Sequence, residues 1–258
     1  MSRLVVFLDD GGVMNDNAVR GPQWQRLVAE FFAPILGGAP AAWAEANRVV
    51  AEGLLEPVAW RARALAAADY AAFDRAYQRD WLGGMCALVG VAAPPEEEGF
   101  ALANRANAWV TRRVRSACPG AVEAIRALAA RGYALHTASG EHSADLAGYL
   151  EGMGVRGHFG RLYGPDLLGA FKEGPEYYAR LFADAGVAPA DALVVDDSPR
   201  AVAWAREVGA RAVLVSAPKT PKTPLGAGPL GAGAPTGDGA TPRIAGLAEL
   251  PAVIERFA

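Results

Sequence analysis

Two pairs of adjacent acidic residues stand directly after short apolar runs of this chain. Asp9-Asp10 and Asp196-Asp197 each follow such a run, and two glycines follow the first pair. A carboxylate at the C-terminal tip of a buried parallel strand points into the crevice where open α/β sheets bind ligands. There it could act as a nucleophile or bind a metal ion. For either pair alone, an ordinary turn is the competing interpretation, because Asp and Gly are common turn residues.

A hydroxyl and a lysine stand at comparable positions. Thr137 ends the apolar segment 134–137, and Lys172 lies just before a predicted helix. Because the carboxyl ends of parallel strands meet at one edge of a sheet, we expect these side chains to converge with the two acid pairs. Two acid pairs, a hydroxyl and a lysine at successive strand ends are hard to explain as ordinary turns.

Short strands alternating with helices must position these residues. The pattern predicts buried strands over 4–8, 134–137, 192–195 and 212–215. It predicts helices over 120–131 and from 198 to about 208, the second with Ser198 as N-cap and Pro199 as its first residue. Strand, helix and strand in this order indicate βαβ units. The fold class is therefore α/β, with a Rossmann-like parallel sheet as its core.

Between residues 16 and 115 the pattern becomes helical, and no convincing strand interrupts it. We therefore predict an inserted helical domain over 16–115, within a core formed by 1–15 and 116–258. The tryptophans at positions 43, 60, 81 and 109 are interpreted as core residues rather than ligand contacts. The Pro/Gly-rich range 217–242 predicts a flexible loop, and 243–258 predicts a short strand and a closing helix.

The overall composition excludes several classes of protein. The chain has 258 residues, 52% hydrophobic and 21% charged, so it can bury a full core. Its formal net charge of −3 gives no reason to expect nucleic acid or a membrane surface as partner. The two cysteines, Cys86 and Cys118, form no metal-binding pair. With no signal peptide or membrane span recognised, we expect a cytoplasmic location.

The motifs around these residues closely resemble those of the haloacid dehalogenase-like hydrolase superfamily, in their order and over nearly the whole chain. Leu-Asp-Asp-Gly-Gly-Val-Met from Leu8 is similar to the first motif, and Leu-His-Thr-Ala-Ser from Leu135 to the second. Lys172 stands where the third motif has its lysine, and Val-Val-Asp-Asp-Ser-Pro-Arg from Val194 resembles the fourth. The predicted helical insert lies where this family places a helical cap.

The resemblance implies a role for each of these residues. Asp9 would be the nucleophile and would form a covalent aspartyl intermediate. Mg²⁺ would be bound by Asp9, Asp196 or Asp197 and the carbonyl of Gly11. Thr137 and Lys172 would stabilise the transferring group, a catalytic role. The substrate-binding set implied is Gly11, Gly12, Thr137, Ala138 and Lys172. The expected substrate is a small molecule, most simply a phosphate monoester.

One departure from the family pattern concerns the proton. Phosphatases of this family usually carry a second Asp two residues after the nucleophile, as general acid and base, and here that position is Gly11. Placing Asp10 at the acid position would put Leu8 at the nucleophile position, so Asp9 is favoured as nucleophile. Loss of a general acid typically costs about 10²–10⁴-fold in rate. An acid from the cap, a good leaving group or slow hydrolysis would each accommodate it.

Two alternatives therefore stay open. Dehalogenases of the same superfamily also lack the second Asp and work without metal, although the pair Asp196-Asp197 argues for a cation. A catalytically weak member that binds a small anion or a partner is the third hypothesis. The sequence identifies neither the substrate nor the oligomeric state.

Overall fold

The computed structural model describes residues 4–216 and 241–257. Within these residues the strands form one six-stranded sheet, in the order β3-β2-β1-β4-β5-β6, and every pair is parallel. The strands are β1 (Val5–Leu8), β2 (Ala134–Ala138), β3 (Phe159–Tyr163), β4 (Ala192–Asp196), β5 (Arg211–Val215) and β6 (Arg243–Ile244). This arrangement confirms the predicted α/β class with a parallel sheet.

The register of the central strands brings their carboxyl ends to one level. Leu8 at the end of β1 is paired with Thr137 of β2 on one side and with Val195 of β4 on the other. The residues that follow Leu8 and Val195 are Asp9 and Asp196. Pairing in the centre of the sheet therefore places the predicted chemical groups at its carboxyl edge, where α/β proteins bind ligands.

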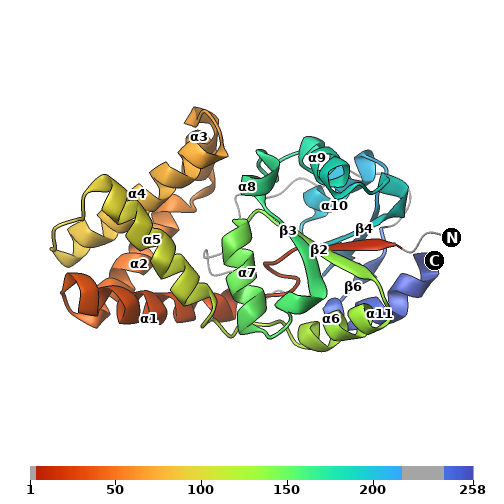
Figure 1. The fold of residues 1–258 in the computed structure, drawn as a ribbon, viewed down its shortest axis with the longest axis horizontal. Coiled ribbons are helices and arrows are strands. Elements are labelled where there is room, and N and C mark those ends of the chain that lie inside the picture. The colour runs from red at the N-terminus through yellow and green to blue at the C-terminus, as the bar shows by residue number, and fades with distance from the viewer. Residues whose placement is uncertain (1–3, 217–240, 258) are drawn as a thin grey trace.

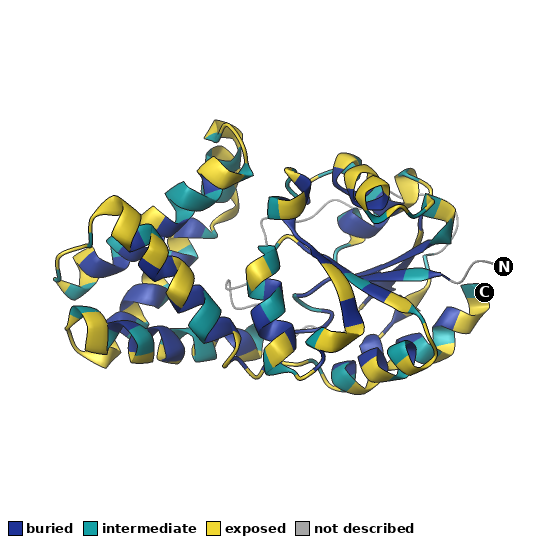
Figure 2. Cartoon of the chain, in the orientation of Figure 1, coloured by how far each residue is buried: buried dark blue, intermediate teal, exposed yellow. Residues whose placement is uncertain are grey.

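Helices cover both faces of the sheet, as a parallel sheet requires (Figure 1). Val6 and Leu8 of β1 pack into one apolar cluster with α6 and α7, whereas Phe7 packs into a second cluster with α9. Figure 2 shows the central strands as buried. The helices here are α6 (Ala121–Ala130), α7 (Ser143–Gly152), α8 (Pro165–Leu168), α9 (Pro175–Ala185), α10 (Pro199–Glu207) and α11 (Leu250–Val253), with 3-10 turns at Arg156–His158, Pro189–Asp191, Leu247–Glu249 and Ile254–Phe257.

Five further helices form a separate lobe, on the left of Figure 1. They are α1 (Asn17–Leu36), α2 (Pro40–Leu54), α3 (Pro57–Ala66), α4 (Tyr70–Val89) and α5 (Glu96–Thr111). The lobe has its own apolar cluster, in which the stacked rings of Phe32 and Trp43 are fully buried. Trp81 is buried there as well, as predicted, whereas Trp60 and Trp109 are half-buried.

The two chain segments that connect this helical lobe to the sheet run side by side. Asn15 forms an antiparallel bridge with Ala117, and the amide of Asp16 donates to the carbonyl of Ser116 at 2.7 Å. The side chain of Gln23 extends this contact through hydrogen bonds to the backbone of Arg115. The lobe therefore leaves the sheet and returns to it at one place.

The C-terminal segment folds largely as predicted. β6 adds a short strand to the sheet, and Leu247, Leu250 and Ile254 are buried against α6 and its neighbours. Most of the predicted flexible loop over 217–242 lies outside the described residues, which resume at Thr241. Among the helices of the described segments, none combines the length and the apolar character needed to cross a lipid bilayer.

Candidate active site

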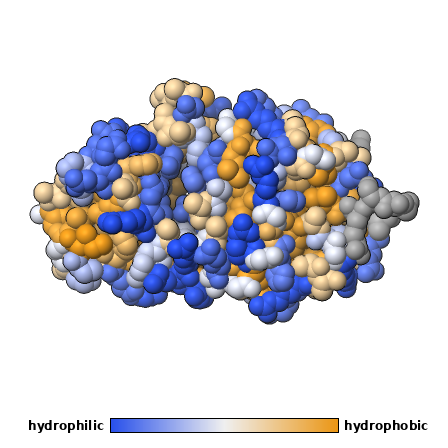
Figure 3. Space-filling view, in the orientation of Figure 1, coloured by the Kyte–Doolittle hydropathy of each residue, from blue (hydrophilic) through white to orange (hydrophobic). Residues whose placement is uncertain are grey.

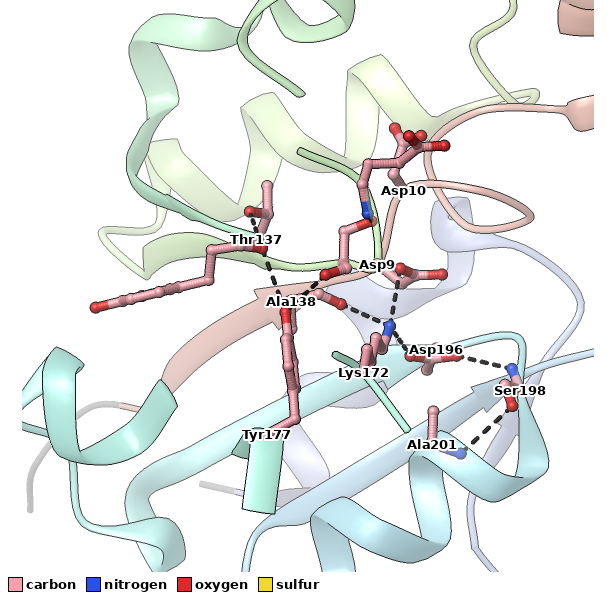
Figure 4. A network of polar contacts seen from close by, with 12 residues as sticks. Asp9, Asp10, Thr137, Ala138, Lys172, Tyr177, Asp196, Ser198 and Ala201 are labelled. Carbon is pink, nitrogen blue, oxygen red and sulfur yellow. Dashed lines mark hydrogen bonds and ion pairs between the residues drawn. The ribbon is translucent and has the colours of Figure 1, made fainter. Parts of the chain in front are cut away.

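Lys172 lies at the centre of the candidate site. Its Nζ atom is 2.9 Å from Asp9 Oδ1, 2.6 Å from Asp196 Oδ2 and 2.7 Å from the carbonyl oxygen of Ala138, and it donates to these three acceptors. All of these groups are buried or nearly so. Figure 4 shows the ammonium group between the two carboxylates. The two carboxylates outweigh the effect of burial and raise the pKa of Lys172 well above its usual value. The lysine is therefore a permanent cation in this site.

Asp196 is fixed by its place at the end of β4. Its Oδ1 atom accepts a hydrogen bond from the amide of Ser198 at 2.8 Å, and Ser198 in turn caps the N-terminus of α10, as predicted. Burial raises the pKa of Asp196 to about 6, with a further contribution from Asp9, although Lys172 opposes the change. At neutral pH the Asp196 carboxyl is therefore mostly ionised, and its negative charge favours a further cation beside Lys172.

Three carboxylates at this edge could hold a metal ion together. Asp9, Asp196 and Asp197 each offer an oxygen, and these oxygens lie within 4.8 Å of one another. An all-oxygen set is the kind that Mg²⁺ prefers. Gly12 makes room for the third carboxylate, because a Cβ atom at Gly12 would lie 2.4 Å from Asp197 Oδ2. The donor atoms and the space left by Gly12 fit a hard divalent cation.

Asp10, although adjacent to the nucleophile candidate, belongs to a different group of residues. Its carboxylate accepts hydrogen bonds from the Asn15 side chain at 2.6 Å and from Arg20 Nη1 at 2.5 Å, and it is completely buried. In Figure 4 its side chain extends away from Lys172. Arg20 is buried as well, since only 4% of its side chain is exposed. Asp10 therefore anchors α1 to the sheet.

The predicted substrate-binding residues lie around the same edge. Thr137 is the last residue of β2 that pairs with β1, and its hydroxyl donates to the carbonyl of Tyr163 at 3.1 Å. Ala138 follows it and presents its carbonyl to Lys172. Gly11 and Gly12 form the turn after Asp9, where the amide of Gly12 donates to the carbonyl of Asn15. These positions agree with the predicted grouping, whereas a contact between Thr137 and a substrate would require its hydroxyl to rotate.

The loop that carries Lys172 also touches the helical lobe. The ring of Phe171 lies 5.0 Å from the ring of Phe73 and 5.5 Å from the ring of Tyr70, centroid to centroid, both on α4. On the sheet side, Tyr177 donates its hydroxyl to the carbonyl of Ser139. The lysine loop therefore packs on α4 through Phe171, and the helix that follows it, α9, is hydrogen-bonded to the segment after β2 through Tyr177.

A cavity of about 220 Å³ lies where the helical lobe faces the N-terminus of α7. It is lined by Gln78, Asn104, Asn107, Ala108, His142, Ala144 and Asp145. In the space-filling view the surface along the junction of the two lobes is mainly hydrophilic (Figure 3). Five of the seven lining residues have polar side chains, and the side-chain amides among them can donate and accept hydrogen bonds.

Two polar residues outside the sequence motifs also contact Arg20. Glu141 follows β2, and its Oε1 lies 3.6 Å from Arg20 Nη2. Asn17 accepts a hydrogen bond from the same guanidinium group. The sequence contains one indirect signal for these contacts. Asp10 adjoins the candidate nucleophile Asp9, and if the Asp10 carboxylate is buried it needs a cationic partner, for which a nearby arginine is suited.

Comparisons with known proteins agree with this architecture. The family model for haloacid dehalogenase-like hydrolases matches residues 6–209. A phosphoglycolate phosphatase from Rhodospirillum rubrum is 35% identical over 101 residues, which are 39% of this chain and 42% of that protein. The chain therefore matches less than half the length of this curated relative.

Solved structures with a similar fold include two dehalogenases. The L-2-haloacid dehalogenase of Xanthobacter autotrophicus has a TM-score of 0.60 at 17% identity, and the 2-haloacid dehalogenase of Pseudomonas syringae pv. Tomato DC3000 has 0.61 at 18%. Both alignments cover 100% of each chain. At such identities the likeness concerns the fold alone.

Proposed function

Since the chain belongs to the haloacid dehalogenase-like hydrolase family and is thus a hydrolase, we propose that it hydrolyses phosphate monoesters with Mg²⁺, through an aspartyl phosphate on Asp9. The observation that carries this proposal is the cluster of Asp9, Asp196 and Asp197 around Lys172. A carboxylate that attacks an anionic phosphate needs positive charge nearby, and one lysine does not balance three carboxylates.

Each residue of the cluster then has a distinct task. Asp9 is the nucleophile, and its oxygen that does not face Lys172 is the one free to attack phosphorus. Asp196 and Asp197, with Asp9, would hold Mg²⁺, which neutralises negative charge on the transferring group when bound. Lys172 holds Asp9 in place through their ion pair, and its ammonium group would also stabilise negative charge on the phosphoryl oxygens.

We further assign the helical lobe, over about residues 16–115, as a cap that covers the site and excludes water. Its α4 packs on the lysine loop through Phe73, and α4 and α5 together form one wall of the cavity. A small phosphorylated substrate would place its phosphate at Asp9 and its leaving group toward this lobe. The phosphatase among the relatives supports this substrate class, although its match covers only part of each chain.

A panel of phosphate monoesters, assayed with and without Mg²⁺, tests the proposal. We expect Mg²⁺-dependent release of phosphate by the natural chain and a loss of at least about 10³-fold in Asp9→Asn. The control is a substitution at an acid outside the cluster. Asp10 is buried and therefore unsuitable, whereas Glu151 is exposed, so Glu151→Gln serves as the control and should retain full activity. Equal activity of the natural chain and Asp9→Asn would exclude Asp9 as nucleophile.

A metal-independent dehalogenase is the second candidate, favoured by one observation. Gly11 supplies no acid, and a halide leaves without a proton. The solved structures of similar fold include dehalogenases, which is consistent with this candidate at the level of the fold. Halide release from 2-haloacids in the presence of a chelator, abolished by Asp9→Asn, would establish it in place of the phosphatase.

A further inference from the structure

The space beside Gly11 is occupied by groups that cannot act as acids at neutral pH. A Cβ atom at Gly11 would lie 3.0 Å from the side-chain amide of Asn17 and 3.2 Å from Arg20 Nη2. An amide does not ionise, and a guanidinium keeps its proton in proteins. None of the groups in this space can therefore supply a proton to a leaving group.

Glu141 lies on the other side of the same guanidinium nitrogen. Its Oε1 atom is 3.6 Å from Arg20 Nη2, the atom that borders the space beside Gly11. Its backbone amide donates to Ser139 Oγ, which fixes the loop after β2. The other carboxylate on Arg20, that of Asp10, is wholly buried and doubly hydrogen-bonded, whereas 38% of the Glu141 side chain is exposed. Glu141 is thus the carboxylate on Arg20 that a substrate could reach.

Glu141 directly precedes, along the chain, the residues of α7 and its N-cap that line the cavity. The next residue, His142, lines that cavity together with Asp145. A leaving group that extends from Asp9 toward the helical lobe would therefore pass close to Glu141. This position suits a residue that must reach the bond between phosphorus and the leaving oxygen.

The surroundings of Glu141 raise the pKa of its carboxyl group, chiefly through burial. Partial burial raises the pKa of Glu141, Asp10 and Asp9 raise it further, and Arg20 and His142 act in the opposite direction. Titratable side chains face it from several elements: Arg20 on α1, Asp9 and Asp10 after β1, Tyr70 and Tyr77 on α4, and His142, Asp145 and Tyr149 at α7. A carboxyl with a raised pKa can donate a proton nearer to neutral pH than an ordinary glutamate.

We propose that Glu141 is the general acid and base of this enzyme, in place of the carboxylate that Gly11 lacks. The inference rests on the proposed phosphatase function. In the first step an oxygen of Asp9 attacks phosphorus, the bond from phosphorus to the leaving oxygen breaks, and that oxygen takes the proton of Glu141 to give an alcohol. In the second step the Glu141 carboxylate takes a proton from water as its oxygen attacks the aspartyl phosphate. The bond to Asp9 breaks, which releases phosphate and restores both side chains.

Rapid-mixing kinetics with two esters test this assignment. p-Nitrophenyl phosphate has a leaving group that needs no proton, whereas an alkyl phosphate has one that does. In Glu141→Gln with Mg²⁺ we expect one equivalent of nitrophenolate to appear in a burst, followed by slow turnover, because no base activates water. Intact-protein mass spectrometry should show the trapped aspartyl phosphate. The alkyl ester should give no burst and turn over about 10²–10⁴-fold more slowly than with the natural chain.

Two further variants separate catalysis from structure. Glu151→Gln, an exposed glutamate on α7 paired with Arg112, should match the natural chain with both esters. Adding Gly11→Asp with Asn17→Ala to Glu141→Gln should restore turnover of the alkyl ester, because a carboxylate then fills the enlarged space. Equal slowing of both esters without a burst, in a folded Glu141→Gln protein, would overturn the role of Glu141 and leave the phosphatase intact. If the natural chain cleaves neither ester, both the proposed phosphatase activity and the role of Glu141 are contradicted.

Discussion

Arg20 Nη1 lies 2.5 Å from Asp10 Oδ2, and both side chains are buried, so the first turn of α1 is joined to the end of β1 by an ion pair out of contact with water. The neighbouring Asp9 instead faces Lys172. Two adjacent acids of one turn thus serve opposite purposes. Asp9 belongs to the proposed active site, whereas Asp10 joins α1 of the helical lobe to the end of β1.

We therefore expect opposite consequences from two matched substitutions. Asp10→Asn leaves the Arg20 charge buried with a weaker partner and should lower the free energy of unfolding by about 3–5 kcal/mol. Asp9→Asn should abolish turnover yet change stability far less, because the 12% exposed carboxylate of Asp9 is less deeply buried. Urea unfolding and phosphatase assays on both variants check this. A stable, inactive Asp10→Asn protein would reverse the two assignments.

Gly12 should be sensitive to substitution for two separable reasons. Its φ is +81°, and a Cβ atom would overlap the Asp197 carboxylate. Gly12→Ala should cost about 1–2 kcal/mol of stability from the backbone alone, and it should also weaken Mg²⁺ binding by displacing Asp197.

Gly90→Ala is the matched control for this substitution. Gly90 has a φ of +79° and nothing within 4 Å of its Cβ position. It should show the loss of stability without any effect on Mg²⁺, as measured by thermal unfolding and by calorimetric titration. Equal Mg²⁺ affinity in both variants would contradict a metal role for Asp197.

Binding of Mg²⁺ should depend on pH through Asp196. The pKa of this carboxyl is raised to about 6, so below that pH a proton competes with the metal. The apparent affinity for Mg²⁺ should fall by up to about tenfold per pH unit below 6 and level off above 7. Calorimetric titration between pH 5 and pH 8 measures this. Asp196→Asn should bind more weakly throughout and lose the dependence that stems from this group.

In the metal-free protein, the raised pKa of Asp196 makes the folded state more stable at low pH than at neutral pH. The folded state holds the Asp196 proton up to about pH 6, whereas the unfolded chain releases it near its ordinary pKa of about 3.9. The contribution of this group to stability is therefore fully present below about pH 4 and is lost as the pH rises through 6. Comparison of the natural chain with Asp196→Asn in chelator isolates it from the other carboxylates.

Lys172 should be required for folding as well as for catalysis. Lys172→Met leaves Asp9 and Asp196 close together without their shared cation, and breaking a buried pair in this way costs about 3–5 kcal/mol. Mg²⁺ should raise the melting temperature of this variant more than that of the natural chain, because the metal then supplies the missing positive charge. A smaller rise in Lys172→Met would argue against a cation between these carboxylates.

The sequence was most informative where burial and chemistry coincide. Strands β1, β4 and β5 are mostly apolar on both faces because helices cover both faces of the sheet, and such runs are easily recognised. β3 escaped prediction because it is an edge strand with exposed Gly160 and Arg161 in its middle. It nevertheless supports the site, since its Tyr163 carbonyl accepts from Thr137 and from the amide of Ser139.

Contacts between distant segments could not be predicted from one sequence. The motifs identified Asp9, Lys172 and Asp196, because each follows or precedes a recognisable element. Arg20 and Glu141 lie within ordinary polar sequence, and their meeting depends on how α1 docks against the loop after β2. That docking is a tertiary property which the local pattern does not encode.

The side-by-side connection at Asn15 and Ala117 bears on how the chain folds. β1 pairs with β2 across the whole helical lobe, and closing so long a loop would ordinarily slow folding. Because the lobe has its own apolar cluster and its two ends meet, its prior collapse would bring β1 and β2 together as though a short linker joined them. The nucleus that sets the folding rate is then expected within the helices, and core strand mutations should mainly accelerate unfolding.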